Sequence, residues 1–450
     1  MDSKRSSFTG KIGFVLAAAG SAVGLGNIWR FPYLAAKYGG GIFLLVYIAL
    51  SVTFGFTLMI AEIAIGRKTQ SSPIGAFRAL DKRFTFVGWI AALVPTVILP
   101  YYSVIGGWVT KYFFGFLTGN ASEMAEAGYF GDYIGQVGEP VFWFVLFMTI
   151  TVVIVLLGVD KGVEKVSKIM MPVLILLIIF IVIYTLCTVD GAWGGVIYYI
   201  KPDFSKFSIM TVVAAMGQLF YSMSLAMGIM ITFGSYMKKD ISIEAATKQI
   251  EIFDTGVAFL AGLMIIPAVY AADPNSLGAK GPGLMFEALP HIFDGMVGGS
   301  FIGAAFFLMV FFAALTSSIS LMETIVSIFI DKLKIGRKLA CVLVFLISLV
   351  LGLLSCLGYS AWDNVKIIGL QILDFFDFAS NSVIMPIVAL ATSIFVGFLI
   401  KPQTIIDEVS LSGEFKAKRL FSIVIKYVAP VCLVLILVSS VLDVFGIVKI

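Results

Sequence analysis

The stretch GSAVGLGNIWRFP, residues 20–32, lies inside an apolar segment and decides how the whole chain is interpreted. Its surroundings are hydrophobic enough for a membrane helix, yet it contains three glycines, an asparagine and an arginine. Each glycine weakens a helix by about 1 kcal/mol relative to alanine, and polar groups are costly in a bilayer unless they face a cavity, a ligand or one another. The stretch predicts a broken helix with a site at the break or, from the spacing of Gly20 and Gly24, tight packing of two helices.

The composition is that of a polytopic membrane protein. Of 450 residues, 60% are hydrophobic and 13% are charged, and the mean hydropathy is +1.04. The net charge of +4 comes from short basic clusters between apolar segments, so a nucleic-acid partner has little support. The lone His291 makes haem or zinc chemistry hard to build. The four cysteines show no paired spacing and predict buried thiols.

Apolar segments of about 20 residues are long enough to span a bilayer as helices. The sequence predicts an all-α membrane protein with about eleven of them, at 11–36, 41–66, 86–117, 140–158, 166–187, 209–237, 242–271, 299–330, 338–357, 366–399 and 420–446. Basic residues concentrate in the loops that would share one side of the membrane, which predicts a cytoplasmic N-terminus and, after eleven spans, an extracellular C-terminus. The first segment is too long for a cleavable signal and predicts a retained helix.

A second weakened segment follows five helices after the first. It reads GQLFYSMSLAMG, residues 217–228, and carries hydroxyls and glycines deep in an apolar run. Two interrupted helices at corresponding positions indicate a transporter built from an inverted repeat, with its substrate at the interruptions. The predicted division is a cytoplasmic segment (1–10), a first repeat (11–187), an extracellular loop (188–208), a second repeat (209–400), a cytoplasmic loop (401–419) and an eleventh helix with the C-terminus (420–450).

Other polar side chains interrupt the remaining apolar helices. Thr316 and Ser317 are adjacent in FFAALTSSIS, residues 311–320, while Tyr101 and Tyr102 lie in the third helix and Asp254 in the seventh. Helical hydroxyls usually bond back to the carbonyl one turn earlier. If the first helix is broken, however, its backbone carbonyls at the break lose their helical hydrogen bonds. Together with the hydroxyls of Thr316 and Ser317, these carbonyls would form an all-oxygen site that suits a hard monovalent cation.

The three quoted motifs resemble the neurotransmitter:sodium symporter family, especially its bacterial amino-acid transporters with the LeuT-like fold. The likeness extends over nearly all of residues 4–400 and implies a secondary transporter rather than an enzyme. It implies symport of a neutral, large hydrophobic or aromatic amino acid with two sodium ions by alternating access. The alternatives are another small amine or zwitterion as substrate, or a passive channel. An intramembrane enzyme would need a catalytic pair, and the sequence offers none.

The resemblance also implies a role for individual residues. A first sodium ion would be bound by Ala22, Asn27, Ser222 and Asp254, together with the substrate carboxylate. A second would be bound by Gly20, Val23, Ala313, Thr316 and Ser317. Around the substrate the family pattern places Ala22, Leu25, Gly26, Ile98, Tyr102, Tyr221, Ser222, Ser224, Met227, Ser317 and Leu321.

The gates are implied in the same way. The outer gate would pair Arg30 with Asp377 above an aromatic lid of Tyr102 and Tyr221 that separates the pair from the substrate, and the inner gate would pair Arg5 with Asp331 near Tyr236. Gly162 and Pro172 match a motif linked to unwinding of helix 5, although an ordinary helix start would explain them as well.

Four departures from the family pattern carry their own expectations. Asp254 replaces asparagine, and its fixed charge predicts transport that requires no chloride. Met227 replaces phenylalanine and suits bulky substrates, whereas Ala226 replaces glycine and narrows the site. Phe8 replaces tryptophan, which predicts a looser inner latch.

Overall fold

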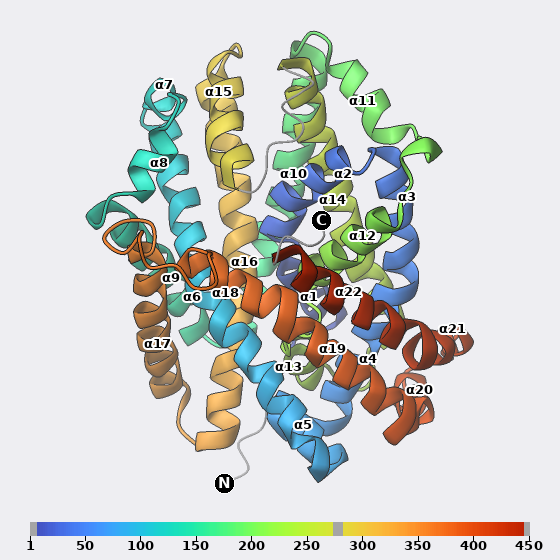
Figure 1. Cartoon of the computed structure of the whole chain (residues 1–450). Coiled ribbons are helices and arrows are strands. Elements are labelled where there is room, and N and C mark those ends of the chain that lie inside the picture. The colour runs from blue at the N-terminus through green and yellow to red at the C-terminus, as the bar shows by residue number, and fades with distance from the viewer. Residues whose placement is uncertain (1–6, 273–281, 445–450) are drawn as a thin grey trace.

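Apolar helices make up nearly the whole of this computed structural model, which describes residues 7–272 and 282–444 (Figure 1). Within these ranges, nine helices are long and apolar enough to cross a membrane, and a tenth span is the pair Lys11–Ala22 and Gly26–Lys37, bent by 54°. The predicted all-α membrane fold is therefore confirmed. The count of eleven stays a prediction, because Ile209–Ser222 has only 14 residues.

The spanning segments consist of α-helices, several of which continue through a π-helical turn (η). They are α1 (Lys11–Ala22), η1 (Gly26–Arg30), α2 (Phe31–Lys37), α3 (Gly41–Leu50), η2 (Ser51–Gly55), α4 (Phe56–Thr69), α6 (Thr85–Leu117), α9 (Gly138–Leu156), η4 (Val159–Glu164), α10 (Lys165–Thr188), α12 (Ile209–Ser222), α13 (Ile229–Ser235), α14 (Ile243–Ala272), α16 (Gly299–Leu333), α17 (Arg337–Leu357), α18 (Ile372–Asp377), η8 (Phe378–Ile384), α19 (Met385–Ile394), η9 (Phe395–Leu399), α21 (Lys418–Ile423), η10 (Val424–Val428) and α22 (Ala429–Val444).

Short helices connect these segments. At the end of the bundle where the chain begins are α5 (Pro73–Leu80), η3 (Lys82–Phe84) and α20 (Lys401–Ser410), and the remaining connections are α7 (Ala121–Met124), α8 (Tyr129–Ile134), α11 (Ala192–Ile200), η5 (Phe204–Lys206), η7 (Leu284–Ala288) and α15 (Leu289–Asp294). Figure 1 shows α7, α11 and α15 at the end of the bundle opposite α5. We call these the amino-terminal end and the far end.

The first helix breaks after Ala22. Val23 leaves the helix with φ −74° and ψ 98°, and η1 begins at Gly26. Gly20 stays inside α1, so only Gly24 and Gly26 lie at the break. A side chain on Gly24 would come within 2.8 Å of the Ser317 hydroxyl oxygen. The glycines at this break therefore provide space for side chains of neighbouring helices.

A second break separates α12 from α13. Between them Ser224, Ala226 and Gly228 adopt positive φ values of 53°, 61° and 71°. This left-handed conformation costs a residue other than glycine about 1–2 kcal/mol. The Ser224 hydroxyl donates to the Ser21 carbonyl at 2.9 Å, and the Ala226 amide donates to Glu62 Oε1 at 2.7 Å. These hydrogen bonds stabilise the unwound segment against the two neighbouring helices.

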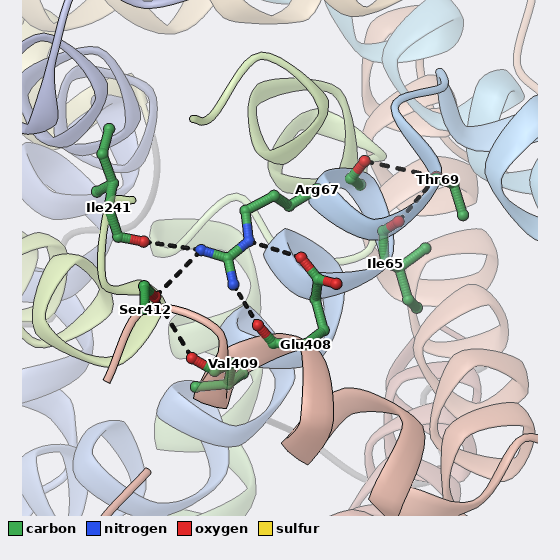
Figure 2. Close-up of polar contacts among 8 residues, drawn as sticks. Ile65, Arg67, Thr69, Ile241, Glu408, Val409 and Ser412 are labelled. Carbon is green, nitrogen blue, oxygen red and sulfur yellow. Dashed lines mark hydrogen bonds and ion pairs between the residues drawn. The ribbon is translucent and has the colours of Figure 1, made fainter. Parts of the chain in front are cut away.

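A buried ion pair closes the amino-terminal end. The fully buried Arg67, near the end of α4, donates to Glu408 Oε1 of α20 at 2.8 Å and to the Ile241 carbonyl at 2.7 Å. Its guanidinium also reaches the Glu408 carbonyl and the Ser412 hydroxyl (Figure 2). The cluster joins helices that are far apart in the sequence, and no motif in the sequence had indicated it.

The cysteines correct one expectation. All four are free thiols, and Cys341 and Cys356 are buried as predicted. Cys187 is exposed and Cys432 is half-buried. The prediction of buried thiols is wrong for Cys187, because it lies on the last turn of α10 with its side chain directed away from the bundle.

Candidate functional site

A narrow cavity of about 30 Å³ lies between the two helix breaks. It is lined by Ser21, Ala22, Gly24, Leu25, Gly26, Ile98, Tyr102, Tyr221, Ser224, Met227, Ile229, Ser317 and Leu321. Ten of the eleven residues predicted to surround a substrate are in this lining, and the exception, Ser222, faces Asp254 instead. The sequence interpretation missed Ser21, Gly24 and Ile229, although two of them lie in the opening motif. Tyrosine hydroxyls are the only ionisable groups in the lining.

One wall of the cavity is polar. The Leu25 amide donates to the Tyr102 hydroxyl at 3.2 Å. The Ser21 carbonyl accepts hydrogen bonds from Ser224 at 2.9 Å and from Ser317 at 3.1 Å. A backbone amide beside a hydroxyl suits a carboxylate, and freed carbonyls suit an ammonium group. The wall therefore offers complementary partners to both ends of a zwitterion.

Another part of the lining is apolar. It is formed by Ile98 of α6, Met227 in the break between α12 and α13, and Leu321 of α16. Among them, Met227 has an unbranched side chain that can adopt several shapes. This wall offers a flexible apolar surface to a ligand side chain.

Asp254 lies at the centre of a fully buried polar cluster next to the cavity. Its Oδ1 accepts hydrogen bonds from Ser222 at 2.7 Å and from the Asn27 amide at 2.8 Å, while Oδ2 accepts one from Tyr47 at 3.1 Å. The Asn27 oxygen accepts from the Gly24 amide at 3.1 Å. No lysine or arginine pairs with Asp254 in the part of the chain that the structure describes. A carboxylate buried without a cationic side chain fits a cation site.

The second predicted sodium cluster is neutral. The Thr316 hydroxyl donates back to the Phe312 carbonyl at 2.9 Å and the Ala313 carbonyl at 3.2 Å. A Cβ atom on Gly20 would lie 3.3 Å from the Thr316 side chain, so α1 and α16 touch here. Val23 follows at the end of α1. Carbonyl and hydroxyl oxygens are the ligands that hard monovalent cations prefer, so the residues present fit sodium.

Three of the outer gate residues, Arg30, Tyr221 and Asp377, line a second cavity of about 260 Å³, whereas Tyr102 lines the cavity between the helix breaks. Arg30 lies over the Tyr221 ring, 5.4 Å from its centroid. Asp377 instead accepts hydrogen bonds from Tyr101 at 3.1 Å and Asn381 at 2.6 Å. Among the described residues Arg30 and Asp377 form no ion pair. The roles of Tyr101 and Asn381 at this gate had not been predicted.

The inner gate residues lie at the amino-terminal end, where Arg5 falls outside the described residues. Asp331 accepts a hydrogen bond from the Ser72 amide at 2.8 Å. Tyr236 donates to Glu323 at 2.8 Å, and Glu323 pairs with Arg337. Phe8 is buried and meets the rings of Phe233 and Tyr236 edge to face. Phe8 therefore packs among aromatic rings at this end, and the looser inner latch stays a prediction.

The fifth spanning helix, made of η4 and α10, begins close to α9. Gly162 belongs to η4, and a Cβ atom there would lie 2.1 Å from the Ile154 carbonyl oxygen of α9. Pro172 lies within α10, which continues unbroken past it. The structure thus explains Gly162 by close packing. The proposed unwinding of this helix stays a prediction.

A bundle of membrane-spanning helices, two of them broken around a cavity with polar and apolar lining, is typical of a transporter. Comparison with known proteins identifies the family. The model of the sodium:neurotransmitter symporter family matches residues 5–125 and 116–447, and the chain belongs to this family. Its members are sodium-dependent transporters, so the protein is a sodium-coupled membrane transporter and not an enzyme.

Several known proteins are similar over almost the full chain. The sodium-dependent transporter YhdH of Bacillus subtilis (strain 168) is 34% identical, with 97% of this chain and 98% of that protein aligned. A sodium-dependent transporter of Haemophilus influenzae (strain ATCC 51907 / DSM 11121 / KW20 / Rd) is 32% identical over 97% and 98%. The crystal structure of MhsT in complex with L-phenylalanine is 37% identical, with a TM-score of 0.88 over 97% of this chain and 100% of that one. These likenesses confirm the predicted family and fold.

Proposed function

We propose that the protein carries neutral, large hydrophobic or aromatic amino acids into the cell by symport with sodium. The cavity between the helix breaks supports this proposal most directly. It combines a polar wall suited to a zwitterion with an apolar wall of Ile98, Met227 and Leu321, and its lining contains no charged side chain. The similar MhsT structure contains L-phenylalanine, an amino acid of the class that we propose here.

Two sodium ions per substrate are proposed. The Asp254 cluster, with Ala22, Asn27 and Ser222, would hold one ion beside the substrate carboxylate. The neutral cluster of Gly20, Val23, Ala313, Thr316 and Ser317 would hold the other. An ion that shares a carboxylate with the substrate binds better when the substrate is present, and by linkage the substrate binds better with the ion.

Transport without chloride follows from the same cluster. Asp254 supplies a fixed negative charge that is fully buried and hydrogen-bonded by Tyr47, Asn27 and Ser222. A chloride ion would add a second negative charge beside this carboxylate, which is unfavourable in a medium of low polarity. We therefore expect gluconate to replace chloride without loss of uptake.

The proposed cycle uses the two ends of the bundle as gates in a plasma membrane, with the amino-terminal end in the cytoplasm. At the far end Arg30 and Asp377 would close over Tyr102 and Tyr221. At the amino-terminal end the latch would involve Arg5, Asp331 and Tyr236, and unwinding between Gly162 and Pro172 would open it. Exposed ion pairs contribute only about 0–1 kcal/mol, which suits gates that must open.

Uptake by the purified protein in proteoliposomes tests the proposal. Radiolabelled tyrosine should accumulate only with an inward sodium gradient, in chloride and in gluconate alike. Unlabelled leucine, tyrosine, phenylalanine and tryptophan should compete more strongly than alanine or glycine. Strong competition by alanine or glycine would contradict the proposed substrate class, and uptake that collapses in gluconate would contradict chloride independence.

The same assay separates the alternatives. Another small amine or zwitterion as substrate would leave sodium-dependent tyrosine uptake absent while that compound drives sodium entry. A passive channel would show no saturation and no accumulation against a gradient. Saturable, substrate-driven sodium uptake would exclude the channel.

A further inference from the structure

A third, larger cavity opens on the membrane-facing surface of the bundle. It measures about 650 Å³. It lies between η2 with its flanking residues, the middle of α14 and the beginning of α21. Drug-sized ligands typically occupy pockets of about 300–1,000 Å³. The cavity is large enough for a small amphiphile.

The side chains at its opening are apolar and exposed. Val52 is 53% exposed and Ile252 is 71% exposed, and both line the cavity, as do Ile48, Phe259 and Leu420. They belong to segments that span the membrane, where such side chains face lipid. A ligand would therefore enter this cavity from the bilayer.

Glu251 is the acidic side chain in this lining, whose other polar members are Ser51, Lys248 and Thr255. Its residue exposure is only 6%, and its Oε1 atom is buried without a hydrogen-bond partner among the described residues. Glu251 lies eight residues after the start of α14, about 12 Å along the helix axis. A carboxylate oxygen without a partner at this depth is costly, so Glu251 favours a ligand that brings a positive charge or a hydrogen-bond donor.

The neighbouring polar groups are already engaged. Lys248, one turn away, pairs with Glu244 at 2.7 Å. The hydroxyl groups of Ser51 and Thr255 bond to each other at 3.2 Å. Asp254 lies on the next turn and is bound by the cluster around Asn27. Glu251 therefore remains as the polar anchor of this cavity.

We propose that the cavity binds a membrane-dissolved amphiphile whose primary or secondary ammonium group pairs with Glu251 and whose apolar body fills the groove. The charge complementarity selects the head group, and the lining selects the body. An ammonium donates to the carboxylate oxygen and neutralises its charge, whereas a hydroxyl would only donate. This site is separate from the cavity between the helix breaks and does not depend on the proposed substrate.

Gly256 makes the proposal testable without removing the carboxylate. It lines the cavity, and a Cβ atom added there meets no other atom within 4 Å. Gly256→Leu should therefore fill the groove while leaving Glu251 and the helix intact. Glu251→Gln removes the charge and keeps the shape, and Glu414→Gln on an exposed loop serves as the matched control.

The experiment is photolabelling of the purified full chain in phosphatidylcholine nanodiscs with a long-chain primary amine that carries a diazirine on its apolar chain. Labelling should map by mass spectrometry to peptides containing residues 48–56 and 248–259. Dodecylamine should displace the label. Dodecanol and dodecyltrimethylammonium, which lack either the charge or the N–H donor, should displace it at least about tenfold less effectively because charge-assisted hydrogen bonds are the strong ones.

The variants supply the decisive comparison. Labelling of these peptides should fall about tenfold or more in Glu251→Gln and in Gly256→Leu, and should be unchanged in Glu414→Gln. Thermal unfolding of each variant verifies that it is folded. Equal labelling of wild type and Glu251→Gln would overturn the proposal and indicate partition into the apolar surface. Equal displacement by dodecanol and dodecylamine would also overturn it and indicate a hydroxyl-bearing ligand.

Discussion

The two helix breaks serve the same cavity, yet they are produced in different ways. In helix 1 the backbone departs from the helix at Val23 with an ordinary negative φ, and Gly24 and Gly26 leave space for side chains of other helices. In helix 6 two residues other than glycine, Ser224 and Ala226, adopt positive φ. The first break depends on the absence of side chains, and the second on hydrogen bonds that offset local strain.

Different bonds also join the two breaks on either side of the cavity. On one side the charged Asp254 links Asn27 of helix 1 to Ser222 of helix 6. On the other, the neutral Ser21 carbonyl accepts from Ser224 and Ser317. Changes on the charged side should therefore have larger effects than changes on the neutral side.

The largest effect is expected for Asp254→Asn, which removes the charge between the breaks. Hydrogen bonds to charged groups contribute about 1.5–3 kcal/mol, so uptake at limiting sodium in gluconate should fall by about 10- to 100-fold, and chloride should restore part of it. Sodium titrations of tyrosine uptake in both anions measure this. Asp363→Asn, on an exposed loop, is the control. Full activity of Asp254→Asn without chloride would show that the charge has no such role.

Gly26→Ala should have the next largest effect, because it tests the role of space in helix 1. The new Cβ atom would lie 2.4 Å from the Tyr221 ring, and overpacking of this kind costs about 1–3 kcal/mol. Tyrosine uptake should fall about tenfold or more, as measured in proteoliposomes. Gly217→Ala on α12, where a Cβ meets nothing within 4 Å, should leave uptake intact. Wild-type uptake by Gly26→Ala would refute the argument from space.

A moderate effect is expected for Ser317→Ala on the neutral side. It removes a hydrogen bond of about 0.5–1.5 kcal/mol to the Ser21 carbonyl. The sodium concentration for half-maximal uptake should therefore rise about 2- to 10-fold. Ser318→Ala is a matched control, since the buried Ser318 hydroxyl has no partner among the described residues. A shift in Ser318→Ala as large as that in Ser317→Ala would contradict the assignment.

The smallest effect is expected for Ala226→Gly in helix 6. Relief of the left-handed strain, about 1–2 kcal/mol, is about half offset by the entropy that glycine loses on folding, about 0.5–1 kcal/mol. Thermal stability should therefore change little, while competition by tryptophan should improve about two- to threefold because the neighbouring Met227 can move more freely. Competition curves and thermal unfolding measure both. A clear loss of stability would show that Ala226 is not strained.

Much of the site was accessible from the sequence because polar residues are conspicuous in an apolar chain. Ten of the eleven expected substrate residues line one cavity, although their individual roles came from the family resemblance. Three contacts were not indicated by the sequence, although Tyr101 itself stood out as a polar residue in an apolar helix: Tyr101 and Asn381 at Asp377, and Glu408 at Arg67. Two of these contacts join residues more than 250 positions apart. The third, between Asn381 and Asp377, depends on which way the helix is rotated. A local sequence pattern contains neither kind of information.

The sequence by itself determined that this chain crosses a membrane many times and that two of its helices are weakened at related positions, because hydropathy and helix propensity are local properties. Only the tertiary structure decided where each break occurs and what it faces. It showed that Gly24 and Gly26 make room for Ser317 and Tyr221, and that Asp254 is bound by groups from three other helices. Packing decides these contacts, because a buried polar group must find its partner wherever the fold brings one.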